Sequence, residues 1–391
     1  MQTNQLAFTP VIDSKLPHSG TTIFSLMSAL AAENHAVNLG QGFPDFDCDP
    51  ALIDAVTAAM KSGLNQYALM PGVPALRVAI AQKIAYLYGH QYDANNEITV
   101  TAGATQALLT AIQCCVHAGD EVVVIEPAFD SYLPAITLAG GKPVCVQMEL
   151  TEVGYAVPWD KIAAAITTRT RLIMINSPHN PTGSVLLQQD LQKLADIVRG
   201  TDILVLSDEV YEHMVYDGKQ HESVCRHPEL AARAFVVSSF GKTYHVTGWK
   251  VGYVAAPAAL TAEFRKVHQF SLFAVNAPMQ HAIANYMADA RPYLELPGFY
   301  QRKRDLFRDG LQATRFKLLP ADGTYFQCVD YRQISDLPEI EFAQWLTKEI
   351  GVAAIPVSVF YEQAKNSGIV RFCFAKKEET LKTALARLAK V

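Results

Sequence analysis

The sequence has no long run of Lys or Arg, and its 33 basic residues are outnumbered by 38 acidic ones. Nucleic-acid-binding surfaces and polybasic membrane segments depend on clustered positive charge, so a net charge of -5 argues against both. No apolar run approaches the roughly 20 residues of a membrane-spanning helix. Residues 1–15 also lack the apolar stretch of a secretory signal. We therefore expect a cytoplasmic protein that acts on small molecules.

The sequence also lacks the short motifs of several common enzyme classes. It contains no H-E-x-x-H and no G-x-S-x-G, the motifs of zinc peptidases and α/β-hydrolases. Its seven cysteines have no C-x-x-C spacing, so we expect neither disulfides nor a metal site. Gly241-Lys242-Thr243 fails as a P-loop because Val236 stands where a glycine is needed. Gly40-Gln41-Gly42 lacks the third glycine of a dinucleotide-binding fingerprint.

What the sequence does contain is a series of short β-branched runs that alternate with helical segments. Most of these runs are continuously apolar, which is typical of strands covered by helices on both faces. We therefore expect an α/β fold whose large domain has a seven-stranded, mostly parallel sheet flanked by helices. The expected strands are Ile98 to Thr101, Val122 to Ile125, Pro143 to Val146, Leu172 to Asn176, Ile203 to Leu206, Phe235 to Ser239 and Val251 to Ala255.

The two ends of the chain predict a second, smaller α+β domain, since 391 residues exceed what one core usually covers. We expect a large domain at residues 46–290, and a small domain with an N-terminal arm at residues 1–45 and 291–391. Its expected strands are Tyr325 to Val329, Ala353 to Ile355 and Val370 to Phe374. Helical patterns lie at Gly20 to Ala32, Pro50 to Ser62, Ala262 to about Arg308 and Glu341 to Lys348, and a loop at Val37 to Phe46.

Polar or aromatic residues follow several of the expected sheet strands, where open α/β sheets bind their ligands. Gly103, Ala104 and Thr105 form a turn before a helix, and its N–H groups could bind a phosphate. Phe129 could stack on a flat ring, and the Pro-rich turn around Asn180 would fix its amide. Taken alone, a turn such as 103–105 is more often an ordinary glycine turn, and an aromatic such as Phe129 is more often a core residue. The segment around Asn180 is also compatible with a Pro/Gly loop that contains an Asx turn.

Two further strands end in ionisable residues. Asp208 ends a buried run, and a buried acid is costly unless it meets a cation. Tyr211 would lie on the same side as Asp208 if a helical turn begins there. Ser239 and Lys242 follow the run that starts at Phe235, so a lysine stands where strand becomes loop.

The order of these elements resembles that of fold-type I pyridoxal-phosphate aminotransferases of class I/II. Within this class the chain is most similar to the kynurenine aminotransferase and glutamine transaminase K group, and there to bacterial methionine aminotransferases. The resemblance covers nearly the whole chain. It rests on six segments: 38–46 (NLGQGFPDF), 65–67 (NQY), 207–211 (SDEVY), 241–243 (GKT), 247–252 (TGWKVG) and 369–374 (IVRFCF).

The resemblance implies that pyridoxal 5'-phosphate is the cofactor and that Lys242 binds it as a Schiff base. Lys242 would also move a proton between the substrate and the cofactor. Asp208 would pair with the pyridine nitrogen and keep it protonated. Tyr211 and Asn180 would hydrogen-bond the phenolic oxygen, and Phe129 would stack on the ring.

The resemblance also implies the ligands of the phosphate and of the substrate. Donors to the phosphate would be Gly103, Ala104, Thr105, Ser239, Lys250 and, from a second subunit, Tyr67. Arg371 would bind the substrate α-carboxylate with Gly42 and Asn180. Phe24 and Phe273, together with Tyr67 and Phe129, would line the side-chain pocket. Tyr67 and Phe273 would cross the interface of a homodimer.

We expect a ping-pong transaminase that takes the amino group of a sulfur-containing or aromatic L-amino acid, with methionine first, and gives it to a 2-oxo acid. Phenylalanine, tyrosine, tryptophan, glutamine and kynurenine are further expected donors. A β-lyase acting on cysteine S-conjugates is an alternative that the sequence leaves open. A PLP-binding regulatory protein is more remote, because no basic helix-turn-helix region is added to the fold.

Overall fold

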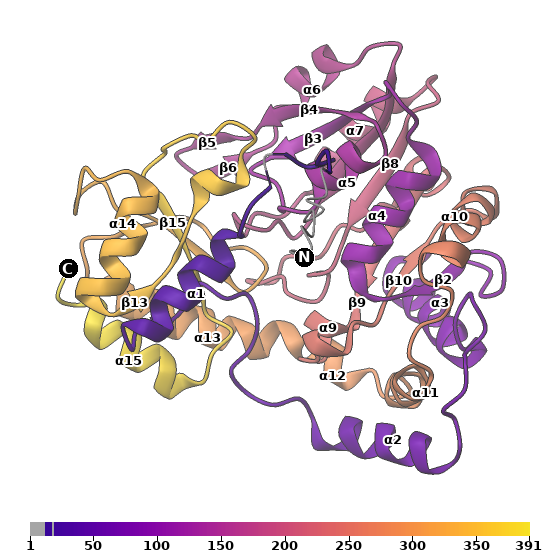
Figure 1. Cartoon of the computed structure of the whole chain (residues 1–391), viewed down its shortest axis with the longest axis horizontal. Helices are drawn as coiled ribbons and strands as arrows, with labels where there is room; N and C mark the ends of the chain where they lie inside the picture. The colour runs from indigo at the N-terminus through magenta and orange to yellow at the C-terminus, as the bar shows by residue number, and fades with distance from the viewer. Residues whose placement is uncertain (1–11, 18) are drawn as a thin grey trace, which may run out of the picture.

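The computed structural model describes residues 12–17 and 19–391. The first part of the expected N-terminal arm, residues 1–11, and residue 18 lie outside the described residues. A seven-stranded mixed sheet with strand order β2-β10-β9-β8-β7-β3-β4 forms the centre of the larger part of the molecule (Figure 1). Its strands are β2 (Ile98–Thr101), β3 (Glu121–Glu126), β4 (Lys142–Gln147), β7 (Thr170–Asn176), β8 (Leu204–Asp208), β9 (Ala234–Ser239) and β10 (Gly252–Ala255). Each of the seven expected runs is therefore one of its strands.

The apolar character of the strands follows from cover on both faces. Alternate residues of β3 belong to two separate clusters of buried residues, with Val123 and Ile125 in one and Val122 and Val124 in the other. One face carries α4 (Gly103–Cys115), α5 (Tyr132–Leu138) and α10 (Ala258–Ser271). The other carries α3 (Pro74–Tyr88), α6 (Trp159–Ala165), α7 (Gln188–Val198) and α11 (Ala277–Tyr286).

The parallel strands bring their polar carboxyl ends to one edge of the sheet. Strands β3, β7, β8 and β9 run in the same direction, while β10 is antiparallel to both of its neighbours. Asn176, which ends β7, is in register with Asp208, which ends β8. Polar side chains at the ends of adjacent strands therefore lie side by side, as expected for a ligand site.

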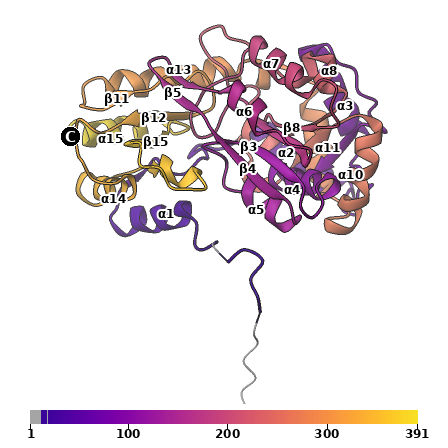
Figure 2. The same ribbon diagram turned by 90° about the horizontal axis from the view of Figure 1, so that it is seen from above.

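The smaller part of the molecule is built on a four-stranded antiparallel sheet, seen at one end of the molecule in Figure 2. Its order is β11-β12-β15-β14, with β11 (Lys317–Leu318), β12 (Phe326–Asp330), β14 (Ile355–Pro356) and β15 (Ile369–Cys373). Helices α13 (Leu296–Leu311), α14 (Glu339–Trp345) and α15 (Glu378–Leu388) pack around it. A π-helical turn extends α14 to Ile350.

Two expectations for these regions need correction. The helical region from Ala262 to about Arg308 is interrupted, because α11, α12 (Arg291–Leu294) and α13 each begin with a proline in their first two positions. The loop expected at Val37 to Phe46 contains a short strand, β1 (Val37–Asn38), which pairs in parallel with β13 (Val352–Ala353). This pairing fixes the start of the glycine-rich segment that follows β1.

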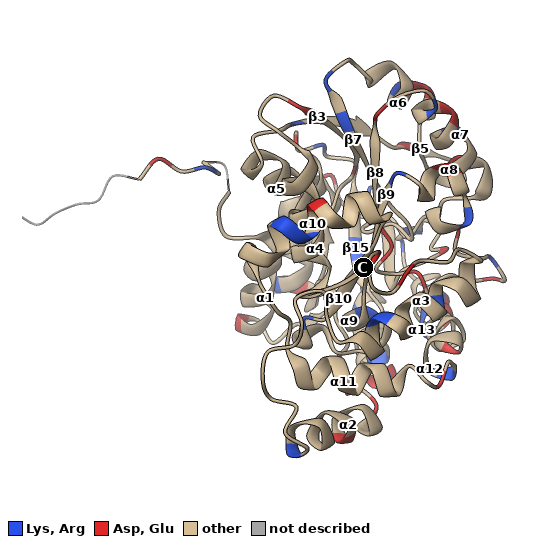
Figure 3. Ribbon diagram, turned by 90° about the vertical axis from the view of Figure 1, so that its right-hand side faces the viewer, with Lys and Arg blue, Asp and Glu red and all other residues tan. Residues whose placement is uncertain are grey.

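The remaining elements are short or lie at the periphery. Helices α1 (Ile23–Glu33) and α2 (Pro50–Lys61) match their expected positions to within a few residues. The others are β5 (Glu149–Thr151), β6 (Gly154–Ala156), α8 (Pro228–Ala231) and α9 (Phe240–Thr243). Among the described residues, no helix combines the length and apolar character needed to cross a membrane. Acidic and basic residues are interspersed along the ribbon (Figure 3).

Candidate active site

A cavity of about 370 Å³ lies at the polar edge of the seven-stranded sheet and reaches the four-stranded sheet through Phe326 and Arg371. It collects thirteen of the fifteen expected site residues: Phe24, Gly42, Gly103, Ala104, Thr105, Phe129, Asn180, Asp208, Tyr211, Ser239, Lys242, Lys250 and Arg371. Tyr67 and Phe273 do not line it.

Lys242 is a buried amine in this cavity. It lies on the one-turn helix α9 rather than in a loop, because the Ser239 hydroxyl accepts a hydrogen bond from Gly241 N and starts a helical turn. Its Nζ donates to the carbonyl of Gly42 over 3.1 Å. Burial lowers the pKa of Lys242 to about 8, so an appreciable fraction of the amine is neutral near physiological pH. A neutral amine can act as a nucleophile or as a base.

Asp208 is a buried carboxylate with neutral partners. Tyr132 donates its hydroxyl proton to Oδ2 over 2.6 Å, and the amide of Val210 lies 3.3 Å from Oδ1. Burial raises the pKa of Asp208 to about 6, although the Tyr132 hydrogen bond opposes the shift. No side chain in the described part of the chain forms an ion pair with it. The cation expected for this acid therefore has to come from a ligand, and a protonated ring nitrogen fits that requirement.

The turn between β2 and α4 has the features of an anion site. Helix α4 has 13 residues and no side-chain cap, so N–H groups of its first turn are left without a capping partner. Gly103 has φ +74°, and a Cβ there would lie 3.4 Å from Lys250 Nζ. The ammonium thus packs against the turn, and Ser239 lines the same cavity. Amides, a hydroxyl and a cation are the donors that phosphate groups bind.

Arg371 lies on β15 and is 1% exposed. Its Nη1 donates to the side-chain oxygen of Asn180 over 2.6 Å, and its guanidinium lies 3.9 Å from the centre of the Phe326 ring. Its Nε is buried without a hydrogen-bond partner in the described structure. A buried guanidinium without an acidic partner is suited to bind a carboxylate of a ligand.

Tyr211 and Asn180 are both buried at the cavity wall. The Tyr211 ring packs edge-on against Tyr325 at 5.2 Å, and Lys242 Nζ lies 5.8 Å from the centre of the Tyr211 ring. The backbone amide of Asn180 donates to the Asn176 side chain over 2.8 Å. Because the Asn180 oxygen accepts from Arg371, its NH₂ group remains as the donor toward the cavity.

Tyr67 and Phe273 contact each other on the surface, with ring centroids 5.3 Å apart. They are 84% and 41% exposed, respectively. Within one chain they therefore reach neither cofactor nor substrate groups. Exposed aromatics of this size are typical of interfaces, so their expected role depends on a second subunit.

Several cavity residues were not assigned a role from the sequence. Asp130, Thr247 and Phe326 line the cavity. Tyr132 does not line it, but its hydroxyl donates a hydrogen bond to Asp208, which does. Tyr132 and Asp130 follow the same strand as Phe129, so their position at the sheet edge was the available signal. Phe326 comes from the other sheet, and no local pattern indicates that it meets Arg371.

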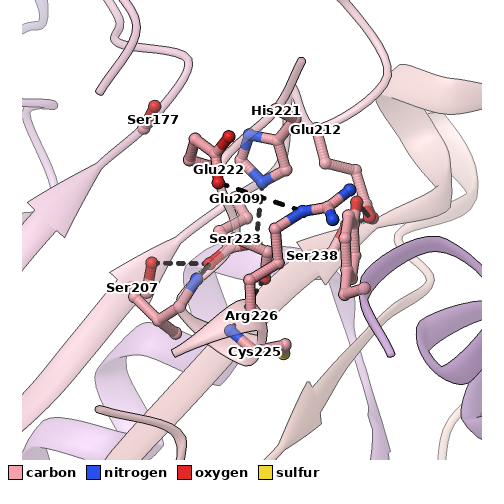
Figure 4. Close-up of polar contacts among 12 residues, drawn as sticks. Ser177, Ser207, Glu209, Glu212, His221, Glu222, Ser223, Cys225, Arg226 and Ser238 are labelled. Atoms are coloured by element: carbon pink, nitrogen blue, oxygen red, sulfur yellow. Dashed lines mark hydrogen bonds and ion pairs between the residues drawn. The ribbon is translucent and has the colours of Figure 1, made fainter. Parts of the chain in front are cut away.

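A buried polar network supports the turn that carries Asp208 and Tyr211 (Figure 4). Glu209 accepts hydrogen bonds from Ser207 at 2.9 Å and from the amide of Val224 at 3.1 Å, and lies 2.8 Å from the ring of His221. Glu212 binds Lys83 Nζ and the Ser238 hydroxyl, each at 2.6 Å. Neither glutamate lines the cavity, whereas Asp208, Val210 and Tyr211 of the same turn do. Glu209 and Glu212 therefore hold the turn in place from the side that faces away from the cavity residues.

Comparison with known proteins agrees with this geometry. The family model described as aminotransferase class I and II matches residues 34–388. The chain is 52% identical to the methionine aminotransferase of Escherichia coli (strain K12), over 96% of this chain and 97% of the relative. It is 36% identical to human kynurenine–oxoglutarate transaminase 1, over 92% of this chain and 93% of that protein.

A solved structure is equally similar. The crystal structure of an Escherichia coli protein with a reported methionine aminotransferase function superimposes with a TM-score of 0.96 at 50% identity. The match covers 98% of this chain and all of the other. Fold, cavity and comparisons agree, and the chain belongs to the class I and II aminotransferase family.

Proposed function

We propose that this protein is a pyridoxal-phosphate-dependent aminotransferase that moves the amino group of a sulfur-containing or aromatic L-amino acid, methionine first, to a 2-oxo acid. The observation that carries the proposal is that one cavity contains a buried amine, a buried acid with only neutral partners, and a buried guanidinium with an unpaired Nε. Each of the three lacks a partner that the cofactor or the substrate would supply.

The residues present fit the cofactor. The first turn of α4 with Ser239 and Lys250 would bind the phosphate, Asp208 would bind the ring nitrogen, and Phe129 would cover a ring face. Tyr211 and the NH₂ group of Asn180 would donate to the phenolic oxygen. When bound, pyridoxal phosphate supplies the carbonyl that takes up the amino group and a ring that accepts electron density from the substrate Cα.

Lys242 and Asp208 would have different roles in the reaction: Lys242 would transfer the proton, and Asp208 would stabilise charge on the cofactor ring. With a pKa of about 8, Lys242 Nζ can take up the proton that leaves the substrate Cα and release it again. The ionised Asp208 stabilises a positive charge at the ring nitrogen, where electron density accumulates during the reaction. The Gly42 carbonyl, 3.1 Å from Nζ, orients the amine.

The substrate would be bound at its carboxylate by Arg371, with help from Asn180 and the backbone of Gly42. Phe24, Phe43, Leu108, Phe129 and Phe326 form apolar parts of the cavity wall, which suits methionine and aromatic side chains. The Escherichia coli methionine aminotransferase, 52% identical over almost the full chain, supports the same donor class.

We further propose two domains and a homodimer. The large domain would comprise residues 46–290, and the small domain residues 1–45 and 291–391. The exposed pair of Tyr67 and Phe273 would enter the cavity of the partner subunit, with Tyr67 reaching the phosphate. The exposed apolar residues Ile53, Met60, Leu64, Leu69 and Phe270 support an interface on this side of the chain.

The visible spectrum of the protein loaded with pyridoxal phosphate tests the proposal. We expect an absorbance band of the bound cofactor that L-methionine or L-phenylalanine bleaches and that a monocarboxylic 2-oxo acid restores. Lys242→Ala should lose this cycle, whereas Lys193→Ala, at an exposed lysine of α7, should retain it. A protein that shows no such band, or whose band persists with both donors while a cysteine S-conjugate yields pyruvate and ammonia, would contradict it.

A further inference from the structure

Gln106 lies one helical turn beyond the segment that would bind the phosphate, and the proposed function does not use it. It belongs to α4, and its side chain is half-buried but does not line the cavity. Its side-chain oxygen accepts a hydrogen bond from the backbone N–H of Ala102 over 3.1 Å. Since Ala102 directly precedes α4, the glutamine side chain reaches back to the point at which the helix begins.

The partners of Gln106 fix the orientation of its amide. A backbone N–H can only donate, so the Gln106 oxygen must face Ala102 and the NH₂ group must face away from it. Nε2 donates to the Thr110 hydroxyl over 2.7 Å and lies 3.2 Å from Nδ1 of His268. Burial lowers the pKa of His268 to about 4, so the ring is neutral near physiological pH and Nδ1 can accept this second hydrogen bond. Both polar atoms of the amide therefore have partners within the protein.

The turn that Gln106 contacts has little rigidity of its own. Ala102 has no side-chain oxygen to cap α4, and Gly103 has φ +74°, in the left-handed region that glycine enters freely. Two side chains hold this turn. Thr101 Oγ1 donates to the carbonyl of Gly103 over 3.1 Å, and Gln106 accepts from Ala102. His268 connects Gln106 to α10, which packs beside α4 on the same face of the sheet.

The hydrogen bond to Ala102 also separates the N–H groups that are used within the protein from those left for a ligand. In the part of the chain that the structure describes, the N–H groups of Gly103, Ala104 and Thr105 have no acceptor. Because the preceding N–H is bound by Gln106, the turn has fewer conformations to lose when an anion binds to these three groups. Such preorganisation increases affinity without any new contact to the ligand.

We propose that Gln106 is a positioning residue for the cofactor phosphate, which holds the 102–105 turn in its binding conformation and is itself supported by His268 of α10. This proposal rests on the cofactor dependence proposed above. Because the Gln106 side chain does not line the cavity, its effect should be confined to the phosphate end of the cofactor. Lys242 and Asp208, which would bind the other end, should act as before.

Three variants separate this role from a general effect on the fold. Gln106→Met keeps the length of the side chain but removes both of its hydrogen-bonding atoms. Gln113→Met makes the same change in the same helix, at an exposed position about two turns further along. Thr110→Val removes one partner of the amide while the bond to Ala102 can remain.

The experiment compares two ligands of the full-length protein freed of cofactor: pyridoxal 5'-phosphate and pyridoxal, which lacks the phosphate. Absorbance titrations give both dissociation constants. In Gln106→Met we expect the affinity for pyridoxal 5'-phosphate to fall about 10-fold, as for ordering the backbone of one residue on binding, while pyridoxal keeps its wild-type affinity. Thr110→Val should lower the affinity ratio by a smaller factor, and Gln113→Met should leave it unchanged.

Equal losses for the two ligands in Gln106→Met, or the same change of ratio in Gln113→Met, would overturn the proposal. If Gln106→Met does not fold, Thr110→Val decides, and a wild-type ratio in that variant counts against Gln106. The binding measurement is independent of turnover. A wild-type protein that binds pyridoxal 5'-phosphate but transaminates nothing would refute the proposed function, and the affinity ratio would still decide the role of Gln106.

Discussion

The hydroxyl of Tyr132 donates a hydrogen bond to Asp208 Oδ2 over 2.6 Å, and both side chains are buried. The hydrogen bond stabilises the ionised carboxylate and opposes the rise of its pKa to about 6. Tyr132 therefore acts through Asp208 and does not need to touch the cofactor. It helps to keep this acid charged near neutral pH.

Tyr132→Phe should raise the pKa of Asp208 further, by about one to two units, because a hydrogen bond to a charged group contributes about 1.5–3 kcal/mol. Only the ionised acid can pair with a protonated ring nitrogen. The affinity for pyridoxal phosphate should therefore begin to fall at a higher pH in the variant than in the wild type. Cofactor titrations between about pH 5 and 8 measure this shift. Tyr86→Phe, at a tyrosine that is 70% exposed, should leave the profile in place.

Lys242→Met should abolish transamination and stabilise the cofactor-free protein. The pKa of Lys242 is lowered from 10.5 to about 8, so the folded state carries a buried ammonium at an energetic cost of up to about 3 kcal/mol. This cost is fully present below pH 8 and disappears as the pH rises from 8 to 10.5. Denaturant unfolding at pH 7 and pH 10 should therefore show a gain that shrinks with pH. An equal gain at both values would contradict the assignment.

Glu212→Gln should destabilise the fold by about 3–5 kcal/mol, because it leaves Lys83 buried without its counter-ion. Although burial opposes it, the ammonium of Lys83 holds the pKa of Glu212 well below its usual range. The stability that this pair contributes should be retained down to strongly acidic pH and lost only as the carboxylate protonates. Urea unfolding measures the loss. The double variant Lys83→Met/Glu212→Leu should recover part of it, since no unpaired charge remains.

Arg371→Lys should lower kcat/KM for methionine by about 100-fold while the cofactor band remains. Lysine retains the charge but loses the planar fork that can bind the two oxygens of a carboxylate together. It also loses the stacking on Phe326. Arg332→Lys provides a control, because Arg332 is a surface residue paired with Asp330. If both variants kept wild-type kcat/KM, the carboxylate would have to bind elsewhere.

The sheet strands could be predicted because their apolar runs are long and bounded by turn residues. Ile98 to Thr101, for example, has the observed bounds of β2. The strand Val37–Asn38 could not be predicted, because two residues carry no periodicity and their partner strand lies at Val352–Ala353. Short strands paired across long sequence distances depend on tertiary packing rather than on local pattern.

The residues of the candidate site, like the strands, could be predicted from the sequence only in part. Asp208 and Lys242 were recognisable because each is an ionisable residue at the end of a buried strand. Asp130 was passed over because an acid in a loop after a strand is usually solvated, and only the structure shows that it lines the same cavity as Arg371. Tyr67 and Phe273 were expected from the resemblance alone, and a single chain leaves them on its surface.

The pairing of β1 with β13 has a consequence for how the enzyme folds. It anchors the segment in which the Gly40 carbonyl accepts a hydrogen bond from Arg371, across 331 positions of the sequence. Closing so long a loop is slow, since its entropy is lost before the contact is gained. We therefore expect the carboxylate site to be among the last parts of the molecule to form. Refolding protein should bind the cofactor before it can distinguish one amino acid from another.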